Sequence, residues 1–489
     1  MSRRLAALAV ALLAGASLAH AKDSVTIGMT LEPPGLDPTA GAAAAIGEIT
    51  HYNIFEGLTK INEDFSLTPL LADSWTFSPD LKTLTLNLRK GVKFQDSEPF
   101  TSRAVKFSFE RYAGKESTNK DRTFFGSIQS IDASDPGKVV LTFKEPSFSA
   151  LFHLGLNTAV IIDEKSATNE ATQPVGTGPY KFVSWSKGSS VTLDAWDGYR
   201  DAAKVAIKHA TFKFIADPAA ETAAMLAGDL DAFPRIVSSS LDQFKADPRF
   251  QVMVGGSEGK TILAINNKEA PFDQLKVRQA IAYALDRKAI IDGASNGLGA
   301  PIGSHLTPND PGYVDLTGQY PHDIAKAKAL LAEAGVKTPL ALTLTLPPPA
   351  YARQGGEIVA AQLAEIGIQA KIENVEWAQW LSNVYTNHTF DLTIISHVEP
   401  LDIAIYANPN YYFGYDNKEF QAIIARWNAA PDLAAYKQAL TDAQHKLADD
   451  SVNGFLFQLP NPVVADAKLM GIWKSAPIFA NDLAALSWK

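Results

Sequence analysis

The second half of this chain alternates between helical and strand patterns, and this alternation leaves few folds open to it. Apolar residues repeat on one helical face over 277–285 and again over 324–331, where the second helix stops at Gly335. Apolar residues at every second position then predict strands over 342–346 and 368–372. Helices and strands that alternate in this way predict α/β lobes built on parallel sheets.

The first half has a different character. Between about 61 and 144, short segments of alternating hydrophobicity predict a mostly β unit. A turn at 176–180 precedes two segments, 180–185 and 190–196, that are typical of a hairpin. An alanine-rich stretch ending in 51–57 predicts a helix near the N-terminus.

Size and composition agree with a large globular protein. The 489 residues, 46% of them hydrophobic and 20% charged, can form about three structural units or one two-lobed protein. The chain contains no cysteine, which excludes disulfides, thiolate metal sites and cysteine nucleophiles. It also excludes a lipid anchor attached through an N-terminal cysteine.

The N-terminus predicts export. Arg3 and Arg4 precede an apolar stretch over 5–19, and Ala19-His20-Ala21 has the small residues of a cleavage site. The apolar stretch is shorter than the ~20 residues that a membrane-spanning helix needs. We therefore expect a cleaved signal peptide over residues 1–21 and a mature protein in the periplasm.

Nucleic acid is not an expected partner. The net charge is −9, and no basic stripe that could follow a phosphate backbone occurs.

The motifs that could support catalysis lack the context that catalysis requires. Two G-x-S-x-G matches, at 255–259 and 293–297, do not lie on a strand-to-helix turn, because the first leads into a strand and the second follows a helix. The nine histidines do not form H-E-x-x-H, and the H-x-E at 397–399 has no cysteine pair. We expect neither an enzyme nor a bound metal or cofactor.

Aromatic and acidic residues gather between Glu376 and Asp416. The group comprises Trp377, Trp380, Tyr385, His388, His397, Glu399, Asp402, Tyr406, Tyr411, Tyr412, Phe413 and Tyr415. Aromatic walls close to carboxylates suit a ligand with a cationic end, although packing within a large lobe would also explain some of these rings. The loop over 391–402 follows a strand, and ligands collect at the carboxyl ends of parallel strands.

Several stretches in order resemble one family, the large extracytoplasmic solute-binding proteins of ABC importers that bind dipeptides, oligopeptides or nickel. One of them reads Val-Gly-Thr-Gly-Pro-Tyr-Lys at 175–181. The others are 55–58, 69–75, 88–94, 228–231, 277–287 and 325–335.

The resemblance implies an α/β fold of two lobes joined by hinge strands, with an extra mostly β subdomain. Lobe I would comprise 22–60, 175–266 and 463–489. The subdomain would cover 61–174, and lobe II 267–462. The ligand would be enclosed between the lobes.

The resemblance also implies where the ligand would lie. Carried over by position, Glu32 lies in a loop that faces the ligand, Phe124 or Phe125 lines it, and Trp377 matches a pocket tryptophan of oligopeptide binders. The pattern departs from peptide binders at the residue that pairs with the peptide amino group, an aspartate there and Pro400 here.

Around this departure, Ser396 and His397 stand where peptide binders have glycine and tryptophan. Glu399 and Asp402 flank the gap, and we predict that one of them supplies the negative partner.

We therefore expect a monomeric solute-binding protein that passes a small ligand to an inner-membrane ABC permease. A short peptide or amino-acid-derived compound is the first expectation for the ligand. A sugar or sugar conjugate, an opine, a polyamine or a metal chelate remain alternatives, and a secreted hydrolase is the alternative from another class.

Overall fold

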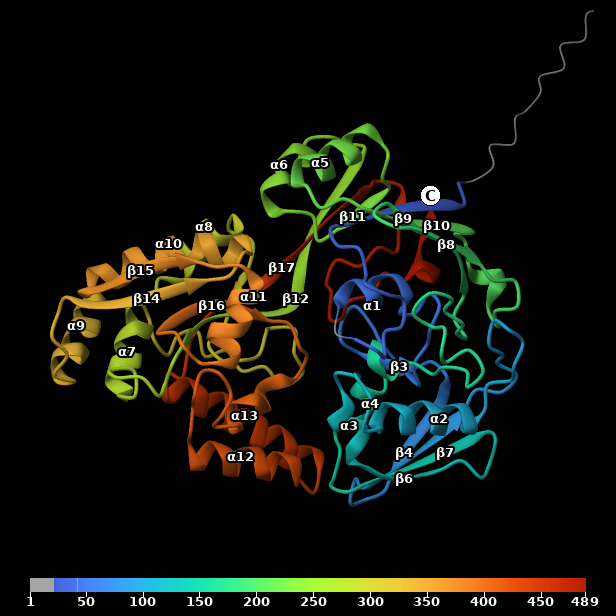
Figure 1. Ribbon diagram of the computed structural model, residues 1–489, viewed down its shortest axis with the longest axis horizontal. Coiled ribbons are helices and arrows are strands. Elements are labelled where there is room, and N and C mark those ends of the chain that lie inside the picture. The colour runs from blue at the N-terminus through green and yellow to red at the C-terminus, as the bar shows by residue number, and fades with distance from the viewer. Residues whose placement is uncertain (1–21, 42) are drawn as a thin grey trace, which may run out of the picture.

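The computed structural model describes residues 22–41 and 43–489, and the predicted signal peptide lies outside them. Figure 1 shows two lobes side by side, with the C-terminus in the lobe that also holds the first strand. Two long strands, β12 (Phe250–Ile265) and β17 (Gly454–Asp466), run from one lobe into the other. They are the hinge strands that the resemblance implied.

One sheet passes through both lobes. Its strand order is β15-β14-β16-β12-β17-β11-β1-β10-β9-β8, with β13 (Ala300–Pro301) paired to β17 beside this path. The hinge strands pair antiparallel, from Phe250 opposite Asp466 to Leu263 opposite Gly454, and their register shifts between Gly256 and Lys260. The regular hydrogen-bond ladder between β12 and β17 is therefore interrupted between the lobes.

Lobe II confirms the predicted alternation. Strands β14 (Leu340–Leu346), β15 (Ile368–Asn374) and β16 (Leu392–His397) pair in parallel. The helices around them are α7 (Leu275–Ala284), α8 (Arg287–Ser295), α9 (Ile324–Glu333) and α10 (Ala350–Glu365). Gly335 and Gly367 follow α9 and α10 with φ of 71° and 84°, which a side chain would make unfavourable.

A second part of lobe II packs against this sheet, and its two longest helices lie below the sheet in Figure 1. Its elements are α11 (Trp377–Trp380), a π-helical segment (Leu381–Thr386), a 3₁₀ segment (Asp402–Ala407), α12 (Lys418–Asn428) and α13 (Leu433–Asp449). Most aromatic residues of the predicted cluster belong to its core, among them Trp380, Tyr406, Tyr412 and Phe413.

Lobe I builds the other end of the long sheet. Its strands are β1 (Ser24–Met29), β8 (Tyr180–Ser186), β9 (Ser190–Ala195), β10 (His209–Phe214) and β11 (Ala232–Pro234). Strands β8 and β9 form the predicted hairpin. The helices are α1 (Ala44–Thr50), α5 (Pro218–Ala227) and α6 (Asp242–Lys245). Helix α1 confirms that a helix forms near the N-terminus, but it ends before residues 51–57, which were predicted to belong to it.

The subdomain has a four-stranded antiparallel sheet, as the alternating pattern predicted. The sheet comprises β4 (Ala72–Phe77), β5 (Thr83–Leu88), β7 (Lys138–Phe143) and β6 (Ile128–Asp132) in that order. A small hairpin, β2 (Thr59–Ile61) with β3 (Leu67–Pro69), and the helices α2 (Ser102–Ala113), α3 (Arg122–Ser127) and α4 (Ala150–His153) complete it. One hydrophobic core extends through this unit and lobe I.

The lobes also touch away from the hinge. Leu401 of lobe II packs against apolar residues of lobe I, and the rings of Phe148 and Tyr436 lie 4.7 Å apart across the opening. Among the described helices, none has the length and apolar character that a membrane span requires.

Candidate functional site

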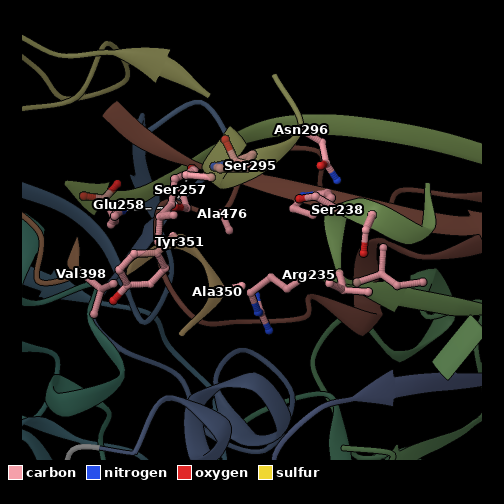
Figure 2. Close-up of a pocket in the computed structure, with 18 of the residues that line it drawn as sticks. Arg235, Ser238, Ser257, Glu258, Ser295, Asn296, Ala350, Tyr351, Val398 and Ala476 are labelled. Carbon is pink, nitrogen blue, oxygen red and sulfur yellow. Dashed lines mark hydrogen bonds between the residues drawn. The ribbon is translucent and has the colours of Figure 1, made fainter. Parts of the chain in front are cut away.

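A cavity of about 340 Å³ lies between the lobes beside the hinge strands. Lobe I contributes the loop after β11, from Arg235 to Ser239, and the segment that includes Ile478 and Phe479. Lobe II contributes the end of α8 and the start of α10. Figure 2 shows Ser257 and Glu258 of β12 on one side and Ser238 and Asn296 on another.

Small residues in β12 allow other chain segments to approach closely. A Cβ on Gly255 would lie 2.1 Å from the carbonyl oxygen of Lys474, and one on Gly256 would lie 2.5 Å from the side chain of Gln458. The hydroxyl of Ser257 donates a hydrogen bond to the carbonyl of Leu459 at 2.9 Å. This G-x-S-x-G match is therefore part of the cavity wall, and its serine is bound to a carbonyl instead of a base.

Arg235 is the cationic side chain of the cavity wall. Its guanidinium lies 2.7 Å from a carboxylate oxygen of Glu48 and 5.5 Å from the ring centre of Phe479. Its backbone has a φ of 61°, a left-handed conformation that side chains disfavour. Such conformations persist where the surrounding structure enforces them, often at ligand sites.

The N-terminal end of α10 also faces the cavity through Ala350, Tyr351 and Gln354. Pro349 precedes this helix of 16 residues and makes no side-chain capping hydrogen bond. The positive end of the helix dipole therefore adds to the charge of Arg235 at the same cavity, and both favour an anionic group.

A buried charged cluster lies behind the cavity wall on the hinge strand. Lys260 is fully buried, with its ammonium 2.9 Å from Asp402 Oδ1 and hydrogen-bonded to the carbonyl of Glu399. Burial acts to lower the pKa of Lys260, but the neighbouring carboxylates of Asp402, Glu258 and Asp310 raise it above its ordinary value. Burial acts to raise the pKa of Asp402, but Lys260 and His305 lower it far below its usual range. Both groups are charged near neutral pH.

Glu258 is the acidic member of this cluster that also contributes to the cavity wall. It is 3% exposed, and neither carboxylate oxygen has a hydrogen-bond partner among the described residues. Burial and the neighbouring carboxylate of Asp310 raise its pKa well above the ordinary value.

His305 and His397 complete the cluster. A tyrosine hydroxyl lies 3.0 Å from each ring, Tyr406 at Nδ1 of His305 and Tyr412 at Nε2 of His397. Burial lowers the pKa of His397 to about 3, and His305 adds to the effect. Donor atoms of these histidines and Asp402 lie within 4.8 Å of one another, a set that transition metals accept. However, the ammonium of Lys260 already lies against Asp402 and would repel a divalent ion there.

Three of the predicted site residues, Ser396, His397 and Asp402, come together beside the cavity. The backbone N–H of Ser396 donates to the hydroxyl of Tyr351, which lines the cavity, at 3.2 Å. His397 and Asp402 belong to the buried cluster, so their polar groups are engaged inside the protein. The side chain of Glu399 is exposed, and Val398 beside it lines the cavity.

The other predicted residues lie away from this cavity. Glu32 is exposed and accepts hydrogen bonds from Trp185 Nε1 at 2.9 Å and the backbone N–H of Gly188 at 3.0 Å, so it supports the β8–β9 hairpin. Phe125 is 2% exposed in the core, and Phe124 stacks on His153 at 4.3 Å. In this arrangement both phenylalanines serve packing of the subdomain.

Trp377 is the predicted residue with the most accessible ring. It is 42% exposed, and Leu381 and Tyr385, which follow it at intervals of four residues, are 49% and 45% exposed. Together they form an apolar stripe on α11 and the π-helical segment. Such exposed apolar groups in one place often mark a contact surface.

Trp377 does not line the cavity, and the prediction from the resemblance is that a ligand extending beyond the cavity covers its ring. We therefore expect Trp377→Ala to weaken ligand binding by more than ~1 kcal/mol. Calorimetric titration with the ligand released from the protein measures this effect. Melting of the ligand-free variant is the control and should change little, since the ring is already partly in water. A large loss of ligand-free stability with unchanged affinity would instead make Trp377 a packing residue.

Sequence reasoning did not identify Arg235, Tyr351 or Glu258. Arg235 comes from a loop in lobe I and Tyr351 from a helix in lobe II, and no local pattern connects them. The run of prolines at 347–349 was the available indication of a helix start at this position.

Comparison with known proteins establishes the family. The protein-family model described as "Bacterial extracellular solute-binding proteins, family 5 Middle" matches residues 66–436. The chain belongs to this family. Family 5 proteins are solute-binding components of ABC importers, extracellular or periplasmic in location, and do not catalyse reactions.

Individual members are similar over most of their length. The chain is 28% identical over 387 residues to the glutathione-binding protein GsiB of Escherichia coli (strain K12), covering 78% of this chain and 75% of GsiB. AgaA of A. tumefaciens in complex with agropinic acid superposes with a TM-score of 0.80 at 26% identity, covering 95% and 99% of the two chains. CtaP of Listeria monocytogenes gives a TM-score of 0.87 at 22% identity, with 96% and 100% covered, and supports the fold. The two-lobed family 5 fold is thereby confirmed.

Proposed function

We propose that this family 5 protein captures a small amino-acid-derived solute, such as a short peptide or a conjugate, and delivers it to an inner-membrane ABC permease. The cavity of about 340 Å³ between the lobes carries this proposal. Its volume lies near the lower end of the roughly 300 to 1,000 Å³ that small-molecule sites occupy. A compound of a few residues fits this size better than a long peptide.

The chemistry of the cavity wall supports a ligand with a carboxylate. Arg235 and the N-terminal end of α10 provide positive charge, and Ser238, Asn296 and Gln354 provide neutral hydrogen-bonding groups. Leu459, Ile478 and Phe479 supply apolar surface. Glu48 already pairs with Arg235, so a ligand carboxylate would share the guanidinium with it, whereas a polyamine would bring further positive charge to this wall.

Two relatives support the same class of ligand. GsiB is named a glutathione-binding protein, and AgaA was solved with agropinic acid. An opine is therefore the second candidate, favoured by the likeness to AgaA at 26% identity.

We further propose residues 22–60, 175–266 and 463–489 as lobe I, 61–174 as its subdomain and 267–462 as lobe II. The mature protein is proposed to be a periplasmic monomer. Size-exclusion chromatography with light scattering of the mature chain tests the monomer.

The function is tested by identifying the bound compound. Freshly purified protein is unfolded, and the released compound is identified by mass spectrometry. An amino-acid derivative that rebinds is the expected result, and at 100 times its dissociation constant it should add ~2.7 kcal/mol to stability. Small-angle scattering should show a smaller radius of gyration with the ligand. A released sugar, polyamine or metal chelate that rebinds would overturn the proposed ligand class.

We expect Arg235→Gln to weaken binding of a carboxylate ligand by ~1.5 to 3 kcal/mol, or roughly 10- to 150-fold, because a charge-assisted hydrogen bond is lost. Arg235→Lys is the matched variant, since it keeps the charge opposite Glu48 but loses the planar fork. It should bind with intermediate affinity in the same calorimetric titration. Equal affinity of all three proteins would show that the ligand carboxylate binds elsewhere.

A further inference from the structure

Leu401 of lobe II packs, partly buried, against an apolar cluster of lobe I. We define the lobe I cluster by its buried residues Tyr52, Ile61, Phe152, Leu156, Ile478 and Ala480. In the part of the chain that the structure describes, Leu401 is the only lobe II member of this group. The contact therefore exists only while the lobes are close together.

The backbone of Leu401 is held in an unfavourable conformation. Its φ of 55° and ψ of 28° are left-handed, a region that a bulky side chain rarely adopts. Strain of this kind persists only when neighbouring contacts enforce it, and it is concentrated at functional sites and switch regions.

Lys260 fixes the loop on both sides of Leu401. Its buried ammonium binds the carbonyl of Glu399, two residues before Leu401, and the carboxylate of Asp402, directly after it. Because Lys260 lies on β12, the position of Leu401 is tied to the hinge strand. The loop therefore presents Leu401 to lobe I as part of the hinge geometry.

We propose that Leu401 is an interlobe latch: by packing against the lobe I cluster it stabilises the closed arrangement of the lobes before ligand binds. The inference rests on the proposed function, in which a ligand is captured between the two lobes. A larger closed fraction raises the apparent affinity, because a ligand that needs the closed state then spends less of its binding energy on closure. The contact between Phe148 and Tyr436 lies elsewhere at the opening, and its two rings are partly exposed.

The absence of cysteine makes a direct test possible. Glu116→Cys in the subdomain and Ala422→Cys on α12, both at exposed positions, place two spin labels across the opening. Distances are measured by electron paramagnetic resonance on full-length mature protein after unfolding, dialysis and refolding have removed bound compound. The doubly labelled protein that keeps Leu401 should contain a population of closed molecules in the absence of ligand.

Leu401→Ala should reduce the ratio of closed to open protein by about 5- to 10-fold, equivalent to about 1 to 1.4 kcal/mol. Leu433→Ala, at a 55% exposed leucine in the same lobe, is the matched control and should leave the distances unchanged.

Leu401→Gly distinguishes the loss of the contact between the lobes from a loss of local stability in the loop. Glycine adopts this φ without strain, so the glycine variant should melt at the same or a higher temperature than Leu401→Ala. Both variants should nevertheless lose the closed population to a similar extent. An open wild-type protein without ligand, or wild-type distances in both variants, would overturn the latch. Neither outcome depends on which compound the protein binds, so a failure here is separate from a failure of the proposed ligand class.

Discussion

Lys260→Met should destabilise the protein by ~3 to 5 kcal/mol, because it leaves the buried carboxylate of Asp402 without its partner. Urea unfolding followed by fluorescence and circular dichroism measures this change. Asp402→Asn combined with Lys260→Met should restore part of the loss, since the uncompensated charge is then removed. The double variant would therefore be more stable than Lys260→Met alone.

Lys288→Met is the matched control. Lys288 pairs with Asp292 at 2.5 Å on the surface of α8, with side chains 82% and 52% exposed. Exposed pairs contribute only about 0 to 1 kcal/mol, so this variant should unfold almost like wild type. Equal effects of Lys260→Met and Lys288→Met would contradict the role assigned to the buried pair.

The stability of the wild-type protein should fall as the pH rises from 5 to 8, with Glu170 as a main cause. Burial raises the pKa of Glu170 from 4.5 to about 8, despite hydrogen bonds from Ser166 and from the backbone N–H of Val175. The unfolded chain releases this proton at lower pH than the folded chain, so deprotonation favours unfolding. Between the unfolded and folded pKa values, the free energy of unfolding falls by up to ~1.4 kcal/mol per pH unit. The stability lost through Glu170 reaches ~3 kcal/mol by pH 7.

Glu170→Gln should remove this contribution to the slope, because glutamine cannot ionise. Chemical unfolding at several pH values measures the difference between variant and wild type. Glu164→Gln, at an exposed carboxylate six residues away, is the control and should keep the wild-type slope. Parallel slopes for wild type and Glu170→Gln would mean that Glu170 does not titrate in this range in the folded protein.

The fold could be predicted to a large extent, because its elements leave local patterns. The parallel strands and helices of lobe II follow apolar periodicity that neighbouring residues carry, and the β8–β9 hairpin follows from the turn before it. Helix α2 of the subdomain was not predicted, although Val105, Phe109 and Tyr112 are spaced for one helical face. The alternating strand patterns on both sides of α2 led to the prediction of a mostly β unit.

The site could be predicted only in part. The predicted loop over 391–402 is wrong in its bounds, because residues 392–397 form strand β16, and from this range Val398 lines the cavity. Which of its groups remain free was not predictable. Asp402 is neutralised by Lys260, a residue 142 positions earlier in the chain, and no pattern within either segment indicates that pairing.

The sequence alone determined the family, the two α/β lobes and the absence of cysteine chemistry, because these depend on residue types and on spacing within short segments. Tertiary structure decided which groups line the cavity and which charges are already paired. Arg235, Tyr351 and Ser257 come from different segments and become neighbours only when the hinge strands bring the lobes together. Burial and neighbouring charges then set the pKa of each group: carboxylates raise the pKa of Lys260 against the effect of burial, and burial raises the pKa of Glu258 on the same strand.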